Sequence, residues 1–68
     1  MSGVCLVNGR ERPLEPNDTV ATLLERIGIA CAYALVERNG EAVARTDFAQ
    51  LRLHDGDRLV VARPVAGG

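Results

Sequence analysis

Lysine and tryptophan are absent from this chain of 68 residues, and its only aromatic residues are Tyr33 and Phe48. All eight basic residues are arginines, and nine acidic residues balance them to a formal net charge of -1. Domains that bind nucleic acid usually carry a strong excess of positive charge, often with aromatic side chains on which bases stack. The composition therefore argues against nucleic acid as a partner.

The chain also lacks clustered cysteines and long apolar runs. Cys5 and Cys31 lie far apart without a CxxC spacing, so neither a zinc site nor a disulfide framework is expected, and no metal site is predicted. No apolar run approaches membrane-spanning length, and Met1 to Val4 lack the basic start and apolar stretch of a signal peptide. We therefore expect a cytoplasmic protein that does not enter a membrane.

The length of the chain limits what it can do alone. With 47% hydrophobic and 25% charged residues, the composition is that of a globular domain. A domain of this size buries only about 60% of the surface that its unfolded chain exposes. This leaves no room for an enclosed active site. It favours a protein on which enzymes act, rather than an enzyme.

Two Asn-Gly pairs predict two β-hairpins, because this dipeptide readily forms a type I′ turn. Asn8-Gly9 follows a short apolar run, and Pro13 in the returning segment indicates the edge of a sheet, where a missing N–H is tolerated. Asn39-Gly40 has the same arrangement later in the chain. The predicted strands are 4–7, 10–14, 33–37, 42–44 and 58–63.

One helix is predicted between the hairpins. Apolar residues recur there at i, i+3, i+4 and i+7, at Val20, Leu23, Leu24 and Ile27. Thr19 or Asp18 can cap the first amide groups, and Gly28 is placed for a left-handed stop. The order of elements predicts an α+β domain in which one helix crosses a mixed sheet of four to five strands.

Several residue types that often carry chemistry have structural interpretations here. Cys5 alternates with strand neighbours and is expected to be a core residue, while Cys31 has no base or positive charge nearby to activate it. His54 lies in a tight turn with its aspartate neighbours. Glu37 and Glu41 flank a turn and are interpreted as solvated hairpin charges.

The C-terminal residues carry the functional prediction. The chain ends in Gly67-Gly68, and because glycine has no Cβ, this pair is slim enough for a narrow channel. Fully extended, residues 63–68 would span roughly 20 Å. We therefore predict a domain over residues 1–63, a flexible tail over 64–68, and chemistry at the terminal carboxylate of Gly68.

In this order, the segments resemble the β-grasp, ubiquitin-like sulfur carriers, and most closely the ThiS-type carriers of thiamine thiazole biosynthesis. The segments that carry the resemblance are Val7-Asn8-Gly9, Thr19-Val20, Leu23-Leu24, 36–41, Asp55-Gly56-Asp57 and 63–68. The chain departs from the family at 44–48, Ala-Arg-Thr-Asp-Phe, where such carriers more often have Pro-Arg-Ser and a bulkier aromatic residue. This departure concerns the packing of a loop and leaves the terminus unaffected.

The resemblance implies that the protein is itself a substrate on which enzymes act. It would bind no cofactor and be a monomer when free. A ThiF-type adenylyltransferase would use ATP and magnesium to adenylate Gly68, and a cysteine desulfurase or sulfurtransferase would supply sulfur for a thiocarboxylate. Thiazole synthase would accept that sulfur. Gly67 would let the tail thread, and Pro64, Val65 and Ala66 would contact the partner's channel.

Other functions are compatible with the same Gly67-Gly68 ending, and they stay open. The chain could be the small subunit of molybdopterin synthase, although those chains usually run longer, or a carrier dedicated to another pathway. It could also be a ubiquitin-like protein modifier, although without lysine it cannot form lysine-linked chains on itself. A β-grasp interaction module with an incidental glycine ending is the remaining alternative.

Overall fold

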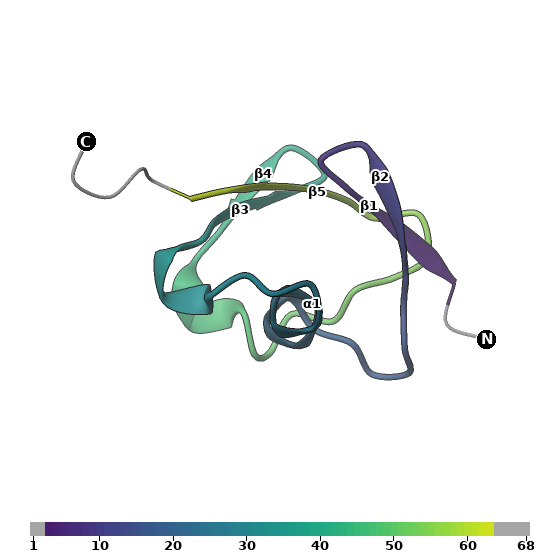
Figure 1. Cartoon of the computed structure of the whole chain (residues 1–68), viewed down its shortest axis with the longest axis horizontal. Helices are drawn as coiled ribbons and strands as arrows, with labels where there is room; N and C mark the ends of the chain where they lie inside the picture. Colours follow the sequence, from purple (N-terminus) through teal and green to yellow (C-terminus); the bar gives the residue numbers. More distant parts are fainter. Residues whose placement is uncertain (1–2, 64–68) are drawn as a thin grey trace.

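One helix lies against one face of a five-stranded sheet in the computed structural model, which describes residues 3–63 (Figure 1). The strands are β1 (Val4–Val7), β2 (Arg10–Pro13), β3 (Leu35–Arg38), β4 (Glu41–Val43) and β5 (Arg58–Ala62). The helix is α1 (Val20–Arg26), and two short 3-10 turns are η1 (Cys31–Tyr33) and η2 (Arg45–Asp47). The predicted fold class, α+β with one helix on a mixed sheet, is confirmed.

The last strand in the sequence occupies the middle of the sheet. The strand order is β2-β1-β5-β3-β4, with β1 and β5 parallel and the other neighbours antiparallel. Val7 of β1 is the register partner of Leu59, and Val36 of β3 is the partner of Val61. β5 therefore joins the two hairpins into one sheet, and it is also the strand that leads to the predicted functional residues.

Both Asn-Gly turns have the predicted left-handed backbone. The φ angles are 53° at Asn8 and 81° at Gly9, and 52° at Asn39 and 87° at Gly40. Positive φ at both central residues is the requirement of a type I′ turn, and asparagine tolerates it better than most residues. Pro13 lies on β2 at the edge of the sheet, as predicted.

The helix begins and ends as its sequence indicates. Thr19 is the N-cap: its Oγ1 accepts a hydrogen bond from the Thr22 N–H at 3.2 Å, while Thr22 Oγ1 accepts one from the Thr19 N–H at 2.8 Å. This reciprocal pair satisfies two N–H groups that the helix leaves unpaired. Gly28 has a φ of 85° just after the helix, in keeping with the predicted stop.

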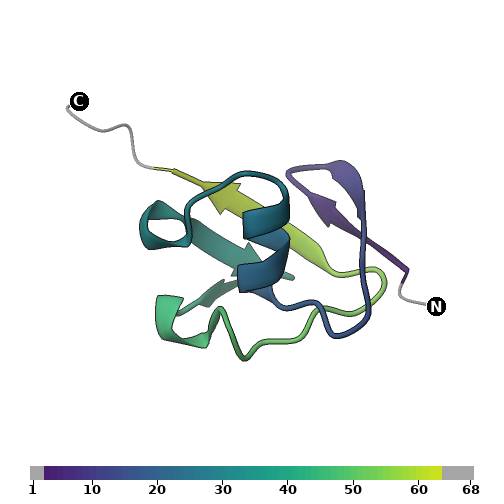
Figure 2. The same cartoon turned by 60° about the horizontal axis from the view of Figure 1, so that its bottom comes forward.

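The core lies between α1 and the sheet, and Figure 2 shows the helix in front of the strands. Leu59 and Val61 of β5 point into it, whereas Val60 and Ala62 are exposed, so successive residues of this strand alternate between the core and solvent. Ile27 and Leu51 pack against it while partly buried. The buried apolar residues are Cys5, Val7, Leu14, Val20, Leu23, Leu24, Ala34, Val36, Phe48, Leu53, Leu59 and Val61.

The predicted strand over 33–37 begins too early. Residues 31–33 form η1, closed by a hydrogen bond from the Ala34 N–H to the Cys31 carbonyl at 3.3 Å, and Tyr33 is 68% exposed. β3 therefore starts at Leu35, and Val36 faces the core while Leu35 faces solvent. β4 starts one residue earlier than predicted, at Glu41.

Two predictions about the whole chain are not decided by this fold. Within residues 3–63, no helix is long and apolar enough to cross a membrane, and the cytoplasmic location stays a prediction. The predicted boundary between a domain and a tail at 63/64 also stays a prediction, because residues 64–68 lie outside the described part of the chain.

Candidate functional site

The residues predicted to carry and deliver the chemistry lie outside the described part of the chain: Pro64, Val65, Ala66, Gly67 and Gly68. What the structure does describe is the strand that leads to them. β5 ends at Ala62, and Arg63 is exposed and is the last described residue. The candidate site is therefore the end of β5 together with the surface around it.

β5 is held on both sides up to this point. On one side it pairs with β3, where Leu35 is opposite Ala62 and Val36 is opposite Val61. On the other side, the pairing with β1 stops at Val7, and Asn8 takes over. Its backbone N–H donates to the Leu59 carbonyl at 2.9 Å, and its side-chain amide makes two hydrogen bonds with the backbone of Val61.

An apolar patch lies on the face of the sheet that points away from α1, beside the end of β5. We call it the outer patch; its members are Leu35, Ala42, Val60 and Ala62. Leu35 and Val60 are 56% and 55% exposed, and a shallow hollow of about 430 Å³ lies over these residues, with Glu37 and Arg45 also lining it. Contiguous exposed apolar surface of this kind often marks a protein interface.

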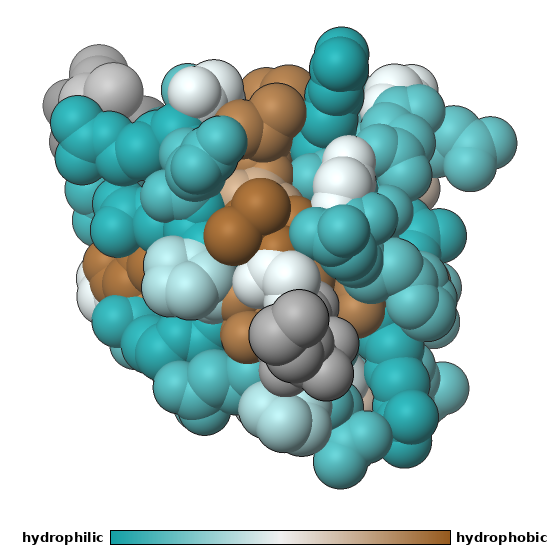
Figure 3. Space-filling model, turned by 90° about the vertical axis from the view of Figure 1, so that its right-hand side faces the viewer, coloured by the Kyte–Doolittle hydropathy of each residue, from teal (hydrophilic) through white to brown (hydrophobic). Residues whose placement is uncertain are grey.

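The side of the molecule shown in Figure 3 is mainly hydrophilic. Hydrophobic side chains form a narrow strip down its middle, between hydrophilic side chains on both sides. In the outer patch, the exposed large apolar side chains are Leu35 and Val60, on the neighbouring strands β3 and β5.

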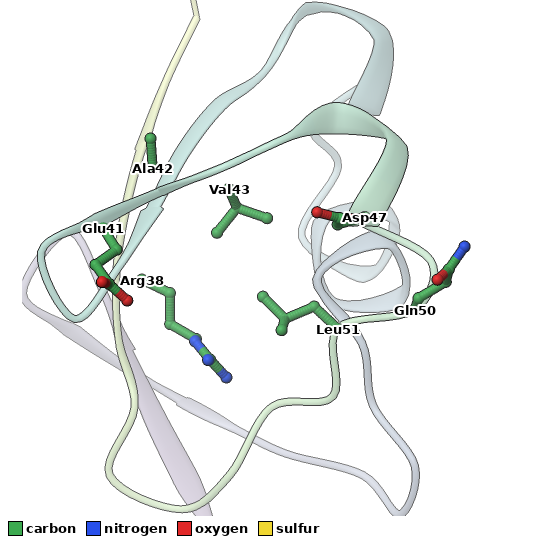
Figure 4. Close-up of a pocket in the computed structure, with 7 residues that line it drawn as sticks. All are labelled: Arg38, Glu41, Ala42, Val43, Asp47, Gln50 and Leu51. Atoms are coloured by element: carbon green, nitrogen blue, oxygen red, sulfur yellow. The ribbon is translucent and has the colours of Figure 1, made fainter.

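A second hollow, of about 330 Å³, lies between the β3–β4 hairpin and the segment that follows η2 (Figure 4). Val43 and Leu51 face each other across it, and Arg38 points into it. The Arg38 guanidinium already contacts the 52–57 loop, where Nη1 donates to the Arg52 carbonyl at 3.4 Å and lies 3.8 Å from Asp57 Oδ2. Glu41 and Asp47 also line this hollow, so its lining combines charges of both signs with apolar side chains.

The two cysteines have structural environments. Cys5 is fully buried, and the pKa of its thiol is raised by burial and, to a smaller extent, by the carboxylates of Asp57 and Asp18. A buried, protonated thiol is unreactive, so the prediction that Cys5 is a core residue is confirmed. Cys31 is half-buried against the core, and its Sγ donates to the Ala21 carbonyl at 3.8 Å.

His54 and the two hairpin glutamates are also placed by the fold. The backbone N–H of His54 donates to Asp57 Oδ2 at 2.8 Å, which makes it part of a turn, as predicted. Within residues 3–63, no three His, Cys, Asp or Glu side chains are grouped so that they could hold a metal. The register places Glu37 and Glu41 on opposite faces of the sheet, so they do not form an acid/base pair.

The sequence analysis missed a buried carboxylate. Asp18 is 4% exposed; Oδ1 accepts from Thr22 Oγ1 at 2.6 Å and from Arg26 Nη1 at 3.0 Å, and Oδ2 accepts from Arg26 Nη2 at 2.6 Å. Arg26 also donates to the Pro13 carbonyl at 3.1 Å, so the cluster ties α1 to β2. The Arg26 guanidinium holds the pKa of Asp18 well below its usual range. The signal was the spacing: Thr22 and Arg26 follow Asp18 at i+4 and i+8, on one side of a helix.

Comparison with known proteins gives one family. Residues 5–68 match the ThiS family. The match includes the Asn8 turn, the helix, the whole sheet except Val4 at the start of β1, and the C-terminal residues that the structure does not describe.

Similar solved structures include two that cover nearly the whole chain. A crystal structure of the thiamine biosynthesis protein ThiS from Geobacter metallireducens has 29% identity and a TM-score of 0.77, covering 96% of this chain and 99% of that one. A solution structure of a thiamine biosynthesis protein from the same organism has 29% identity and a TM-score of 0.74, covering 96% and 87%. The predicted β-grasp architecture is therefore confirmed.

A longer relative is named thiazole synthase, from Paramagnetospirillum magneticum. It is 36% identical over 63 residues, which are 93% of this chain. The chain spans only 19% of the length of that relative, so the likeness concerns one segment of a larger protein.

Proposed function

The chain belongs to the ThiS family, and on this basis we propose that it acts as a sulfur carrier in thiamine biosynthesis, with Gly68 as the residue that bears the sulfur. The observation that carries the proposal is the family match over residues 5–68, supported by a likeness to a ThiS structure over nearly the full length of both chains. In this function the protein is a co-substrate, and its partner enzymes supply the catalytic groups.

The first step of the proposed reaction is activation of the terminal carboxylate. An α-carboxyl group has a pKa of about 3.3–3.7, so Gly68 is an anion at neutral pH and resists attack by a nucleophile. A ThiF-type adenylyltransferase would direct this carboxylate at the α-phosphorus of ATP, with magnesium, and release pyrophosphate. The resulting acyl-adenylate has AMP as a good leaving group.

Sulfur then replaces AMP. The terminal sulfur of a persulfide, supplied by a cysteine desulfurase or a sulfurtransferase, would attack the acyl carbon and expel AMP, which leaves an acyl disulfide. A thiol would reduce the S–S bond and release Gly68 as a thiocarboxylate. Gly67 would allow the chain to enter the partner's channel, because a residue without Cβ needs the least width. Pro64, Val65 and Ala66 would contact the partner's channel behind Gly67.

Thiazole synthase is the proposed acceptor of this sulfur. The supporting observation is that a relative named thiazole synthase contains, in 19% of its own length, a segment similar to 93% of this chain. Two proteins that work together as a carrier and an acceptor can also occur as parts of one polypeptide. The likeness therefore favours the thiazole pathway over the molybdopterin pathway.

The folded domain of the carrier, which we call its body, would be the part that the partner enzymes recognise. A terminal segment of six residues offers little contact area, and its ordering on binding costs free energy, so it is poorly suited to select a partner alone. The outer patch lies beside the strand from which this segment continues and exposes Leu35 and Val60. We propose that the adenylyltransferase and the synthase both contact this patch while they hold Gly68.

The function is tested by incubating the chain with its adenylyltransferase, ATP and magnesium, and measuring ATP–pyrophosphate exchange. Adding the desulfurase should then produce a carrier whose intact mass has increased by the replacement of one oxygen with sulfur. Deletion of Gly68, or addition of one residue after it, should abolish both signals while leaving the circular dichroism spectrum unchanged. Undiminished exchange by either variant would contradict the assignment.

The acceptor is tested with the purified thiocarboxylate. It is offered to thiazole synthase with its sugar and imine substrates, and separately to the large subunit of molybdopterin synthase with its precursor. We expect thiazole to form. Turnover only in the second assay would move the protein to the sister pathway, and transfer of the activated terminus to lysines of other proteins would make it a modifier.

A further inference from the structure

The two Asn-Gly turns hold the two ends of β5 with their side chains. At the start of the strand, Asn39 Oδ1 accepts from the Arg58 N–H at 2.9 Å, and Asn39 Nδ2 donates to Asp57 Oδ1 at 3.1 Å. At the end of the strand, Asn8 Nδ2 donates to the Val61 carbonyl at 3.0 Å, and Asn8 Oδ1 accepts from the Val61 N–H at 2.9 Å. The residues that bond here are 53 positions apart in the sequence.

The Asn8 side chain replaces a missing stretch of β1. Parallel pairing between β1 and β5 includes only Leu6 with Arg58 and Val7 with Leu59, because β1 turns away at Asn8. A carboxamide has one carbonyl acceptor and an N–H donor, like the peptide group that it stands in for here. Both polar backbone groups of Val61 are therefore satisfied on the side where β1 has ended.

We propose that Asn8 is a positioning residue for the reaction at Gly68: its carboxamide keeps Val61 in the sheet and thereby fixes the point from which residues 63–68 continue. The proposal rests on the sulfur-carrier function and concerns a residue that does not touch the reacting atoms. Without the carboxamide, the sheet pairing on this side would stop at Leu59, and Val61 and Ala62 would depend on β3 alone.

The proposed role of Asn8 predicts that loss of its carboxamide weakens binding of the carrier to its partner and leaves the chemical step unchanged. A partner that holds the body and the C-terminus at once benefits if the strand between them is already ordered, since ordering further residues on binding costs conformational entropy. Loosening Val61 and Ala62 should therefore raise the KM for the carrier by about tenfold, the effect expected from one or two additional residues to be fixed. The kcat should be unchanged, because the bound terminus is the same.

The test compares Asn8→Gly with Asn39→Gly. Both residues have positive φ at the same position of a type I′ turn, and glycine keeps that conformation while removing the side chain with its carboxamide. Each variant loses two side-chain hydrogen bonds near β5, but at opposite ends of the strand. The two readouts are steady-state ATP–pyrophosphate exchange at varied carrier concentration, and amide hydrogen exchange at Ala62, the register partner of Leu35 on β3, relative to Leu23 in α1.

We expect Asn8→Gly to raise KM about tenfold with unchanged kcat, and to speed Ala62 exchange at least tenfold relative to Leu23. Asn39→Gly should leave both near their original values. An equal KM in the two variants, or unchanged Ala62 exchange in Asn8→Gly, would overturn the proposal. If the unaltered chain supports no pyrophosphate exchange, the carrier function fails, and exchange at the Ala62 amide still decides whether Asn8 holds the strand.

Discussion

At the scale of single residues, Asp18 shows how one buried carboxylate can organise its surroundings. Besides Thr22 and Arg26, it accepts a hydrogen bond from the Glu15 N–H at 2.8 Å, so the segment before the helix, the first turn and the last turn meet at this side chain. Arg26 reaches it from the end of α1 with 31% of its own side chain exposed. Because the carboxylate is buried and fully bonded, its charge contributes to stability only while it is ionised.

The depressed pKa of Asp18 predicts an acid-dependent loss of stability. Its folded-state pKa lies below the unfolded value of about 3.9, so the contribution is fully present above that value and is lost as the pH falls towards the folded-state pKa. Asp18→Asn should lower the free energy of unfolding by about 1–2 kcal/mol at neutral pH, and by less at about pH 3. Urea unfolding at the two pH values measures both.

Glu15→Gln is the control, because Glu15 is 4.0 Å from Arg26 Nε and its side chain is 67% exposed. An exposed pair of this kind contributes about 0–1 kcal/mol. A loss of stability in Asp18→Asn that is the same at both pH values would show that the ionised carboxylate is not the source.

At the scale of secondary-structure elements, α1 provides much of the core from only seven residues. Val20, Leu23 and Leu24 are fully buried, and the capping pair of Thr19 and Thr22 stabilises the first turn. A helix of this length is not stable alone in water, so its stability in the domain comes from packing against the sheet.

Leu24→Ala should therefore lower the free energy of unfolding by about 2–5 kcal/mol, the usual range for truncation of a buried leucine. For a domain of this size, such a loss is a large share of the total stability. Glu25→Ala, on the exposed side of the same helix, should change it by less than about 0.5 kcal/mol. Equal urea midpoints for the two variants would mean that the buried face of α1 is assigned incorrectly.

The sequence predicted correctly those elements that depend on residues close together in the chain. The turns at Asn8-Gly9 and Asn39-Gly40, the helix and its stop at Gly28 all follow from the residues at those positions. The start of β3 was predicted wrongly because Tyr33 and Leu35 are both compatible with a strand. Only the packed structure shows that residues 31–33 turn and that Val36 is the core residue.

The contacts around the candidate site depend on residues far apart in the sequence. The bonds between Asn8 and Val61 require that β1 and β5 be parallel neighbours, which no local pattern encodes. The outer patch likewise exists because β3, β4 and β5 bring Leu35, Ala42 and Val60 onto one face. The roles of residues 64–68 were predicted from the sequence at the end of the chain, and those roles stay predictions.

At the scale of the whole molecule, recognition and chemistry are proposed to lie at different places. Val60→Ser should weaken binding to the adenylyltransferase by about tenfold, because the partner would cover the exposed half of the Val60 side chain and the variant replaces those apolar groups with a hydroxyl. Val4→Ser removes the same apolar groups from a residue that is 40% exposed on β1, outside the outer patch, and should leave affinity unchanged. Isothermal titration calorimetry with the purified enzyme measures both, and equal affinities would exclude the patch from this interface.

The central place of β5 in the sheet has a consequence for the order in which this protein can acquire its structure. The β1–β2 and β3–β4 hairpins form from residues close in sequence, but they share no strand until Arg58–Ala62 lie between them. During synthesis, residues 58–62 leave the ribosome after everything that they must join. A nascent chain that stops short of Arg58 lacks the strand that joins its two hairpins into one sheet, so the domain closes only when its central strand has emerged.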